Sequence, residues 1–492
     1  MSAGTRPPLS PVPVLVAIVA AAVLLGVAGR YGYHRDELYF IVAGGHPAFG
    51  YPDQPPLVPL LLHAMHWLAP GSLLAIRLPS ALAAAGTILV AALVARELNG
   101  RRAEQVIAAA CTSVTAILLA TGHFVTTTTF DMLSTTVVIW LVVRGLVRHS
   151  GGALLAAGIV TGIGGEAKPQ VVLVYGTLLA SVLLVGPRWP LRSRGLWLGA
   201  LGGAALVLPY LLWQATHGWP QLTVASNIAG SAEGGRAGFI PFQLVLVSPF
   251  LLPVWVAGLV WAWRQARLRL LPLTYLLLAA AYLVGNGKAY YLASLYPALL
   301  AVGAIPVAGW LARGNHRTRV ALLAAALALS AAINALIGLP VLPARDLNGS
   351  APLALNPDLG ETVGWPSLVS TVAGVWRQLP PASRAHTVIF TRNYGEAGAI
   401  DILGPARGLP AAYSGHNAFA EWGPPAADRT QVLLLGYDSP ADAAPAFTAC
   451  RQVARISNPD GVHNQEYGTP VLLCDRMQAP WTVLWPQLRH DN

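Results

Sequence analysis

The sequence carries little charge: Asp, Glu, Lys and Arg make up 11% of its 492 residues, whereas soluble domains average roughly 25%. Hydrophobic residues make up 55%. Apolar runs of about 18 residues or more recur over residues 1–340, and each is long enough to cross the hydrocarbon core of a bilayer as a helix. These features exclude an ordinary soluble protein and predict a polytopic α-helical membrane protein.

Signals for nucleic-acid binding are also missing. The formal net charge of +10 comes mainly from arginines in short segments between apolar runs, where membrane topology explains it. No RNA-binding motif and no basic run on a soluble segment is visible in the sequence. Nucleic acid is therefore excluded as a partner.

The apolar runs predict about eleven transmembrane helices. They lie at 11–29, 72–95, 103–121, 130–147, 152–165, 168–186, 195–216, 241–262, 270–285, 289–311 and 320–340. With a cytoplasmic N-terminus, the inner loops hold fourteen basic residues and the outer loops hold six. This asymmetry follows the positive-inside rule and places the region after residue 339 outside. We therefore expect a membrane domain at 1–342, with a first outer loop at 30–71, and an extracytoplasmic domain at 343–492.

Lysine is scarce, with two residues against 29 arginines, and both lie at expected outer ends of spans. Lys168 and Lys288 could each extend an ammonium group to the membrane interface, as lysines there often do. A compact ammonium group also suits a phosphate. We favour Lys288 as a phosphate ligand and rank Lys168 below it, because Glu166 could neutralise its charge. The residues that could assist Lys288 are Tyr290, Tyr291 and Asn286.

Carboxylates gather at the same side of the membrane. Asp36 and Glu37 follow the first apolar run, and Asp131 lies at the start of a span. Because ionisable groups at membrane depth are costly, Asp131 is expected to face a polar cavity. Asp36 and Asp131 could deprotonate an acceptor hydroxyl or hold a divalent cation, although Asp36 and Glu37 could also be the charged start of an interfacial helix. The residues that could support this site are His34, Arg35 and His123.

The stretch YPDQPPL, residues 51–57, is typical of a turn because its prolines fix the backbone. Asp53 is expected to cap the helix that follows. That helix has about 14 residues with an apolar and a polar face, so we expect it to lie along the membrane rather than cross it.

Polar sequence with short apolar runs begins near residue 343. HTVIF (386–390) and QVLLLGY (431–437) predict buried strands, and each precedes a helix-compatible stretch, EAGAIDILG or PADAAPAFTAC. This alternation predicts a small α/β domain. Candidate acceptor contacts follow the first strand and recur in YSGHN, although loop structure alone explains them as well. They are Asn393, Tyr394, Glu396, His416 and Asn417.

Cysteine is rare, with three residues. Cys111 lies in an apolar run, which indicates a small packing residue. Cys450 and Cys474 flank an expected hairpin on the oxidising side of the membrane. A disulfide between them is therefore expected.

Several motifs in a fixed order resemble those of a known enzyme group. They are HRDELYF followed by GYPDQPPL, then TTTTFDML, GKAYYLASLYP and NYGEAGAIDILGPARGLPAAYSGHN. With these motifs the sequence resembles the GT-C glycosyltransferases of family 39, the protein O-mannosyltransferase and aminoarabinose transferase superfamily, in its bacterial branch. The resemblance runs over nearly the whole chain.

The resemblance implies a polyprenyl-phosphate-linked sugar as donor and inverting transfer to a hydroxyl acceptor at the outer face of the bacterial cytoplasmic membrane. It makes Asp36 the acceptor-activating carboxylate and Lys288, with its tyrosines, the donor-phosphate site. One position departs from the pattern. Aminoarabinose transferases carry a lysine just before the two prolines of the turn, where this chain has Gln54. Phosphate binding by the turn and transfer to lipid A are therefore not expected.

The favoured hypothesis is a membrane glycosyltransferase that transfers a hexose or a pentose. Its partners would be the lipid-linked sugar, membrane lipids and an unidentified hydroxyl acceptor, and no cofactor is expected beyond a divalent cation, which the sequence leaves open. The alternative is a transporter or flippase of a lipid-linked or anionic solute, but transporters commonly have repeated halves, and no repeat is visible in the sequence. A binding or scaffold protein would leave the one-sided carboxylates and lysines unexplained.

Overall fold

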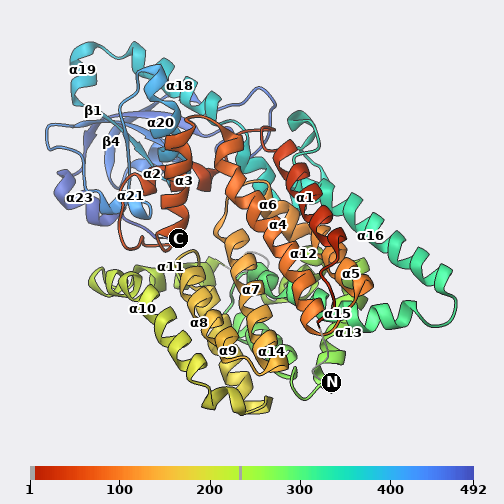
Figure 1. Ribbon diagram of the computed structural model, residues 1–492. Coiled ribbons are helices and arrows are strands. Elements are labelled where there is room, and N and C mark those ends of the chain that lie inside the picture. Colours follow the sequence, from red (N-terminus) through yellow and green to blue (C-terminus); the bar gives the residue numbers. More distant parts are fainter. Residues whose placement is uncertain (1–5, 232–234, 492) are drawn as a thin grey trace. The chain divides into compact units, whose positions relative to one another are not determined.

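The computed structural model describes residues 6–231 and 235–491 (Figure 1). Contacts between residues divide the chain into two units, each built from several segments. The helical unit contains the residues up to Ala28, Arg77–Thr216 and Ala225–Leu339. The mixed unit contains Gly29–Ile76, His217–Val224 and the residues from Pro340 onward.

The apolar segments of the helical unit form helices. They are α1 (Pro11–Gly26), α4 (Leu73–Glu97), α5 (Arg102–Ser113), α6 (Ala116–Gly122), α7 (Thr127–Arg148), α8 (Gly151–Gly165), α9 (Gln170–Val185), α10 (Arg194–Thr216), α12 (Gly235–Val247), α13 (Leu252–Arg264), α14 (Leu270–Val284), α15 (Tyr296–Leu311) and α16 (His316–Gly338). The short 3-10 helices are η1 (Trp189–Arg192), η2 (Pro249–Leu251) and η3 (Ala289–Leu295). A further helix, α11 (Pro220–Ser231), has residues in each unit.

Among the described residues, five helices are long and apolar enough to cross a membrane: α4, α7, α10, η3 with α15, and α16. Two expected spans are bent instead of straight. In 103–121, α5 and α6 differ in direction by 61°, and in 241–262, α12 and Pro249–Arg264 differ by 83°. Up to seven spans are found if each bent pair counts as one. A multi-pass membrane protein is thus confirmed, whereas the expected count of eleven is not, because α1, α8, α9 and α14 have only 15 or 16 residues.

The two bends leave backbone carbonyls that their own helices do not satisfy. Asn334 of α16 supplies a donor to both: its Nδ2 donates to the carbonyl of Val114 at 2.7 Å and to that of Val247 at 3.1 Å. One turn earlier on the same face of α16, the Ser330 hydroxyl pairs with the Ser248 hydroxyl at 2.7 Å. Because an unsatisfied backbone group is costly in an apolar environment, the breaks explain Ser330 and Asn334, the two polar residues of α16 beyond its first turn.

Helices α8 and α10 approach each other closely because glycines meet glycines. A Cβ at Gly158 would lie 2.2 Å from the carbonyl carbon of Gly199, and a Cβ at Gly203 would lie 2.2 Å from the carbonyl oxygen of Gly158. Gly199 and Gly203 are four residues apart, so they share one face of α10. Such small-residue faces let membrane helices pack backbone to backbone.

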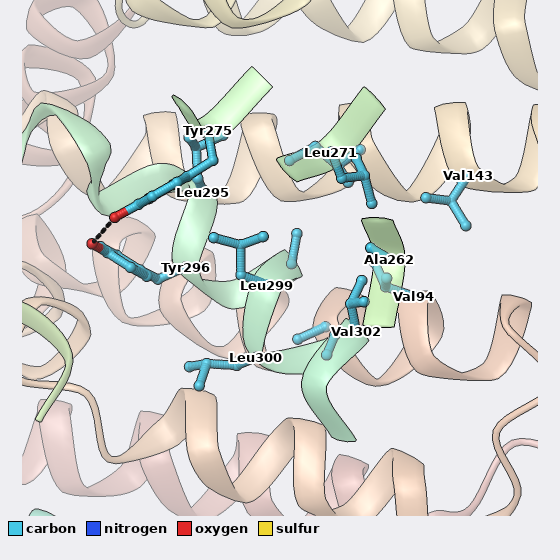
Figure 2. Packing of buried hydrophobic residues seen from close by; sticks show 14 of the residues in the cluster. Val94, Val143, Ala262, Leu271, Tyr275, Leu295, Tyr296, Leu299, Leu300 and Val302 are labelled. Carbon is cyan, nitrogen blue, oxygen red and sulfur yellow. Dashed lines mark hydrogen bonds between the residues drawn. The ribbon is translucent and has the colours of Figure 1, made fainter. Parts of the chain in front are cut away.

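The core of the helical unit also holds the start of η3 in place. In Figure 2, Tyr275 and Tyr296 point toward each other beside packed leucines, and their hydroxyls lie 3.2 Å apart. The Tyr296 hydroxyl donates to Oε1 of Gln243 at 2.8 Å, and Nε2 of Gln243 donates to the carbonyl of Ala289 at 3.0 Å. A chain of hydrogen bonds therefore runs from the apolar core to the first residue of η3.

The mixed unit contains a five-stranded sheet in the order β2-β1-β3-β5-β4. Its strands are β1 (Thr387–Thr391), β2 (Ala412–Ser414), β3 (Gln431–Leu435), β4 (Phe447–Arg455) and β5 (Pro470–Met477). β1 is parallel to β2 and β3, whereas β5 is antiparallel to β3 and β4. Its helices are α2 (Arg35–Gly44), α3 (Leu57–Leu68), α17 (Ala351–Leu355), α18 (Trp365–Gln378), α19 (Pro381–His386), α20 (Tyr394–Leu403), α21 (Ala418–Glu421), α22 (Pro440–Ala443) and α23 (Trp481–Leu488), with η4 (Ala344–Asp346), η5 (Pro357–Thr362) and η6 (Pro405–Arg407).

The two strands expected from the sequence are present as β1 and β3, and a helix follows β1 as expected. The second helix-compatible stretch behaves differently. Only Pro440–Ala443 is helical, and the chain enters β4 at Phe447, because Pro445 has no backbone N–H with which to continue the helix. The expected outer loop 30–71 packs with the C-terminal residues in one unit, through the contact of α2 with α20 described below.

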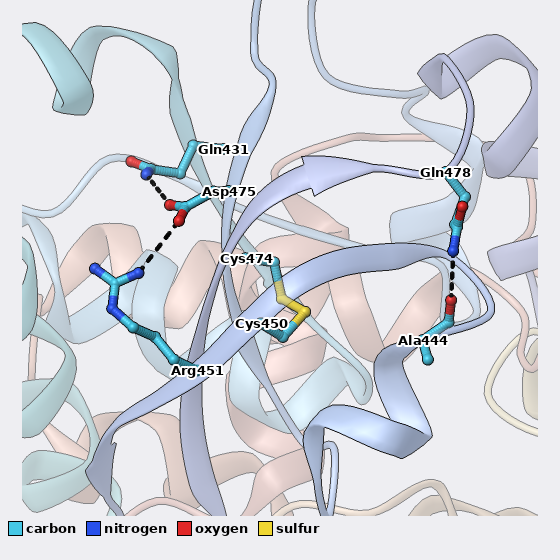
Figure 3. The surroundings of a disulfide bond; sticks show 7 residues. All are labelled: Gln431, Ala444, Cys450, Arg451, Cys474, Asp475 and Gln478. Carbon is cyan, nitrogen blue, oxygen red and sulfur yellow. Dashed lines mark hydrogen bonds and ion pairs between the residues drawn. A yellow bond between two sulfur atoms is a disulfide. The ribbon is translucent and has the colours of Figure 1, made fainter.

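A disulfide joins the last two strands of the sheet. Cys450 of β4 lies opposite Cys474 of β5 in the strand register, and the two sulfurs are bonded (Figure 3). Beside it, Asp475 accepts a hydrogen bond from Nε2 of Gln431 at 2.7 Å and pairs with Arg451 at 3.4 Å. The edge strand β4 is thus tied covalently and by charge to the rest of the sheet.

The glycine contact of α8 with α10 yields a stability prediction. Gly199→Ala places a Cβ 2.5 Å from the carbonyl oxygen of Leu155, so we expect a loss of roughly 1–3 kcal/mol from overpacking. Gly176→Ala on α9 is the matched control, since nothing lies within 4 Å of its Cβ. Thermal unfolding of both variants in detergent is the measurement, and equal midpoints would contradict the packing argument.

The disulfide yields a second prediction, which uses the three cysteines of the chain. We expect denatured, unreduced protein to take up one maleimide-polyethylene glycol, at Cys111, and reduced protein to take up three. Gel mobility measures the number of adducts. Three adducts without reduction would show that Cys450 and Cys474 are free thiols.

Candidate functional site

The first group of candidate residues lies at the start of α2. His34 is the N-cap residue: its Nδ1 accepts a hydrogen bond from the backbone N–H of Asp36 at 3.2 Å. Oε2 of Glu37 accepts from the backbone N–H of His34 at 2.8 Å, which completes a capping box. Glu37 is fully buried, whereas the Asp36 side chain keeps 28% of its surface exposed. Of the two carboxylates, Glu37 therefore holds the helix and Asp36 can meet a ligand.

Asp36 has one short contact and two longer ones. The Tyr394 hydroxyl donates to Oδ1 of Asp36 at 2.9 Å. Nε of Arg35 lies 3.9 Å from the same oxygen, and Nδ1 of His34 lies 3.8 Å from Oδ2. Burial and the negative charge of Asp36 raise the pKa of Tyr394 well above its ordinary value, so the phenol keeps its proton and acts as the donor.

His34 lies near two carboxylates, those of Asp36 and Asp358. Burial lowers its pKa, but the carboxylates of Asp36 and Asp358 outweigh burial, so the pKa of His34 is raised above its ordinary value. Oδ1 of Asp358 lies 3.9 Å from Nε2 of His34. The histidine thus links α2 to η5.

Two glycines let α2 approach α20. A Cβ at Gly395 would lie 2.8 Å from the Cβ of Arg35, and a Cβ at Gly398 would lie 2.9 Å from the carbonyl carbon of Leu38. The glycines are three residues apart and share one face of α20. This close contact places Tyr394, the first residue of α20, within reach of Asp36.

The proline-rich turn differs from the expectation. Asp53 does not cap α3, whose N-cap residue is Pro56 and has no side-chain cap. Oδ1 of Asp53 accepts a hydrogen bond from the Tyr39 hydroxyl at 2.6 Å, and burial raises the pKa of Asp53 to about 7. Both polar atoms of the buried Gln54 side chain lack a hydrogen-bond partner among the described residues. The turn is thus fixed by α2, and the Gln54 amide is available to a ligand or a water.

The candidate acceptor contacts after β1 include residues that stabilise α20 instead. Oδ1 of Asn393 accepts from the backbone N–H of Glu396 at 2.9 Å, and Glu396 returns a bond to the Asn393 N–H, so the pair forms a second capping box. Burial raises the pKa of Glu396 to about 7. Nδ1 of His416 accepts from the backbone N–H of Tyr394 at 3.3 Å, and the backbone N–H of Asn417 donates to His490. Of this group, the structure brings Tyr394 to Asp36 and His416 to Tyr394.

The second group of candidate residues lies in the helical unit. Nζ of Lys168, between α8 and α9, donates to the Thr128 hydroxyl of α7 at 3.0 Å and lies over the rings of Tyr290 and Tyr291 at 5.2 and 5.5 Å. Lys168 attracts the buried Asp131 electrostatically. Its partner is therefore Asp131 and not Glu166, which corrects the reason for ranking Lys168 low.

Lys288 lies close enough to Lys168 for the two charges to repel, so the chain's two lysines share one site. Among the described residues, Lys288 has no carboxylate within ion-pair distance. The following helix η3 is held by Gln243 at Ala289 and by Gln170, whose amide donates to the carbonyl of Tyr291. The segment that carries Lys288 is therefore fixed while its ammonium group remains available to an anion.

Asn286 and His123, which the sequence suggested as site residues, make hydrogen-bond contacts with backbone carbonyls instead. Nδ2 of Asn286 donates to the carbonyl of Ala229 at 2.5 Å. His123 is buried, and its Nδ1 lies 3.2 Å from the carbonyl of Leu119, one turn earlier in its own helix. Where the structure describes the chain, no group of three or more His, Cys, Asp or Glu side chains is arranged to hold a metal ion.

Sequence reasoning missed Tyr39, Thr128, Gln170 and Gln243. Tyr39 follows Asp36 by three residues, so helical spacing puts both on one face of α2, and its ring lies 4.7 Å from that of Tyr394. Thr128 precedes Asp131 by three residues in the same way. The two glutamines give no comparable signal, because their partners lie 46 and 121 residues away.

Comparison with known proteins gives a partial match to one family model and a fold. Residues 53–213 match the model of the dolichyl-phosphate-mannose-protein mannosyltransferase family. A comparison with curated protein sequences found no significant match.

Solved structures with this fold cover nearly the whole chain. ArnT from Cupriavidus metallidurans in the apo state has a TM-score of 0.59 at 16% identity over 94% of this chain and 97% of ArnT. The same enzyme bound to undecaprenyl phosphate has a TM-score of 0.58 at 15% identity over 95% and 98%. The arabinofuranosyltransferase AftD from Mycobacteria has a TM-score of 0.52 at 14% identity over 94% of this chain and 40% of AftD. The chain thus has the GT-C fold, and its resemblance to the GT-C glycosyltransferases of family 39 is confirmed.

Proposed function

We propose that the protein is an integral membrane glycosyltransferase that transfers a hexose or pentose from a polyprenyl-phosphate donor to a hydroxyl acceptor, with inversion. The observation that carries the proposal is the gathering of Lys168, Lys288 and Asp131 beside Tyr290 and Tyr291 at the ends of spans. A lipid phosphate anchored in a bilayer needs compact cations at that depth. The ArnT structure with undecaprenyl phosphate supports a lipid-linked donor.

The proposed reaction is a single displacement at the anomeric carbon of the sugar. The acceptor oxygen attacks the anomeric carbon as Asp36 takes the hydroxyl proton. The bond between the anomeric carbon and the phosphate oxygen breaks, and the electron pair leaves with the polyprenyl phosphate. Lys288 stabilises the charge of this leaving group. Because one displacement occurs at one carbon, the configuration is inverted.

Lys168 and Asp131 have a different part from Lys288 in this proposal. Lys168 interacts electrostatically with Asp131 and donates a hydrogen bond to Thr128. It orients Asp131 and the tyrosine rings around the donor phosphate. Lys288, whose ammonium has no ion-pair partner among the described side chains, contacts the phosphate itself.

The membrane topology and the acceptor contacts complete the proposed function. Fourteen arginines on one side of the spans against six basic residues on the other support a cytoplasmic N-terminus and a site at the outer face of the bacterial cytoplasmic membrane. For the acceptor we propose contacts with the segment of His416 and Asn417, because His416 adjoins Tyr394 and through it Asp36. Gln54 in place of a lysine argues against lipid A as the acceptor.

The base is tested by Asp36→Asn in the purified protein. We expect the rate of undecaprenyl phosphate release to fall about 100-fold or more, since removal of a general base costs on the order of 10²–10⁴ in rate. The donors are undecaprenyl-phosphate-linked hexoses and pentoses, with crude envelope as acceptor.

Asp346→Asn in η4 is the matched control, because that carboxylate is exposed and pairs with Arg345. Full activity of Asp36→Asn would remove Asp36 from its role. Transport of the lipid-linked sugar with no release from any donor would favour the flippase alternative.

The phosphate site is tested by binding of undecaprenyl phosphate, which requires no knowledge of the sugar. We expect Lys288→Ala to weaken binding about 10-fold, the loss of one charge-assisted contact of roughly 1.5 kcal/mol, and Lys288→Arg to retain most of the affinity. Native mass spectrometry measures the bound fraction. Arg267→Ala, at an exposed arginine between α13 and α14, is the control, and equal loss in both variants would indicate nonspecific attraction.

A further inference from the structure

We propose that Tyr394 is a positioning residue for Asp36, so that the C-terminal part of the chain orients the base of the reaction. The inference rests on the proposed function, in which Asp36 accepts the proton of the acceptor hydroxyl. It gives Tyr394 a role in the chemistry in place of the acceptor contact expected from its position after β1.

The contact is specific to one oxygen. The Tyr394 hydroxyl lies 2.9 Å from Oδ1 of Asp36, the one side-chain contact of that carboxylate within hydrogen-bond distance among the described residues. The nearest atoms of Arg35 and His34 lie 3.8 to 3.9 Å from the carboxylate. A hydrogen bond to one oxygen fixes the plane of the carboxylate and leaves the second oxygen to take a proton.

Backbone, aromatic and guanidinium contacts fix the position of the Tyr394 side chain. It is the first residue of α20, and its backbone N–H donates to His416. Its ring lies 4.7 Å from the rings of Tyr39 and His416, and the Arg35 guanidinium lies 5.7 Å from its centre. Gly395 and its neighbours bring the start of α20 against α2. A side chain so confined loses little further entropy when its hydroxyl orders Asp36.

The donor is neutral, and the surroundings explain why. The titratable and charged groups that face this site are His34, Arg35 and Asp53, with Asp358 and Glu361 beyond them. One cation, Arg35, already flanks Asp36. A cation at the position of Tyr394 would bind the carboxylate as an ion pair, whereas a phenol orients it through a neutral hydrogen bond.

The first test needs no substrate. Asp36 is coupled to glycinamide with a carbodiimide at pH 7, and mass spectrometry follows the labelling of the peptide that contains it. A carboxyl oxygen of Asp36 must add to the carbodiimide, and the Tyr394 hydroxyl occupies Oδ1. We therefore expect Tyr394→Phe to raise the labelling rate of Asp36 about 10-fold. Tyr413→Phe, which removes a hydroxyl from β2 of the same unit, should leave it unchanged. An unchanged rate in Tyr394→Phe would overturn the proposal.

The second test is kinetic. With a donor that the wild-type protein turns over, we expect Tyr394→Phe to lower kcat about 10- to 100-fold while KM for the donor changes less than about twofold. In an Asp36→Asn background, Tyr394→Phe should cause no further loss, because it acts through Asp36. Additive losses, or a loss in KM alone, would overturn the positioning role.

The two levels of inference can fail separately. If Asp36→Asn is fully active, the proposed base is wrong whatever Tyr394 does. If Asp36→Asn is inactive and Tyr394→Phe retains the wild-type kcat, the proposed function stands and the role of Tyr394 falls. Circular dichroism and thermal unfolding of Tyr394→Phe, expected to match the wild type closely, separate loss of the hydroxyl from loss of the fold.

Discussion

A polar group inside the apolar helical unit must have a partner, and the architecture depends on how these partners are supplied. At the bends after α5 and α12, Asn334 donates to both freed carbonyls. Glu97 obeys the same rule: it is buried and meets Arg6 at 2.9 Å, Arg148 at 3.5 Å and Arg144 at 3.7 Å. Asn334 and Glu97 can thus each be traced to a structural need.

Against this rule, the residues around Lys288 stand out. Lys168 interacts electrostatically with Asp131, and its ammonium group lies over a tyrosine ring. Lys288, in contrast, has no counterion among the described side chains. At membrane depth such a charge is stable only beside water or an anion. The proposed contact of Lys288 with the donor phosphate would meet this requirement.

The sequence predicted what depends on local pattern. The long apolar runs predicted membrane helices, and the short apolar runs in the C-terminal region predicted β1 and β3. The order of the motifs along the chain indicated the family resemblance. The bend between α5 and α6 was missed because no proline or glycine lies at that junction, and Asn334, the donor to its free carbonyl, is 220 residues from Val114. The bend after α12 was missed although Pro249 lies there. The capping box that separates the roles of Asp36 and Glu37 was within reach of the sequence, because His34 and Glu37 are three residues apart. The interaction of Lys168 with Asp131 depends on the position of α7, which the sequence around Lys168 does not reveal.

The hydrogen bond from Tyr394 to Asp36 joins residues that are 358 positions apart in the chain. During synthesis, Asp36 leaves the ribosome long before its donor exists, and the spans of the helical unit enter the membrane in between. A nascent chain can therefore hold its lysines and tyrosines beside Asp131 while Asp36, the proposed base, still lacks its hydrogen-bond donor. Under the proposed function, the order of the sequence delays activity until the sheet of the mixed unit has formed.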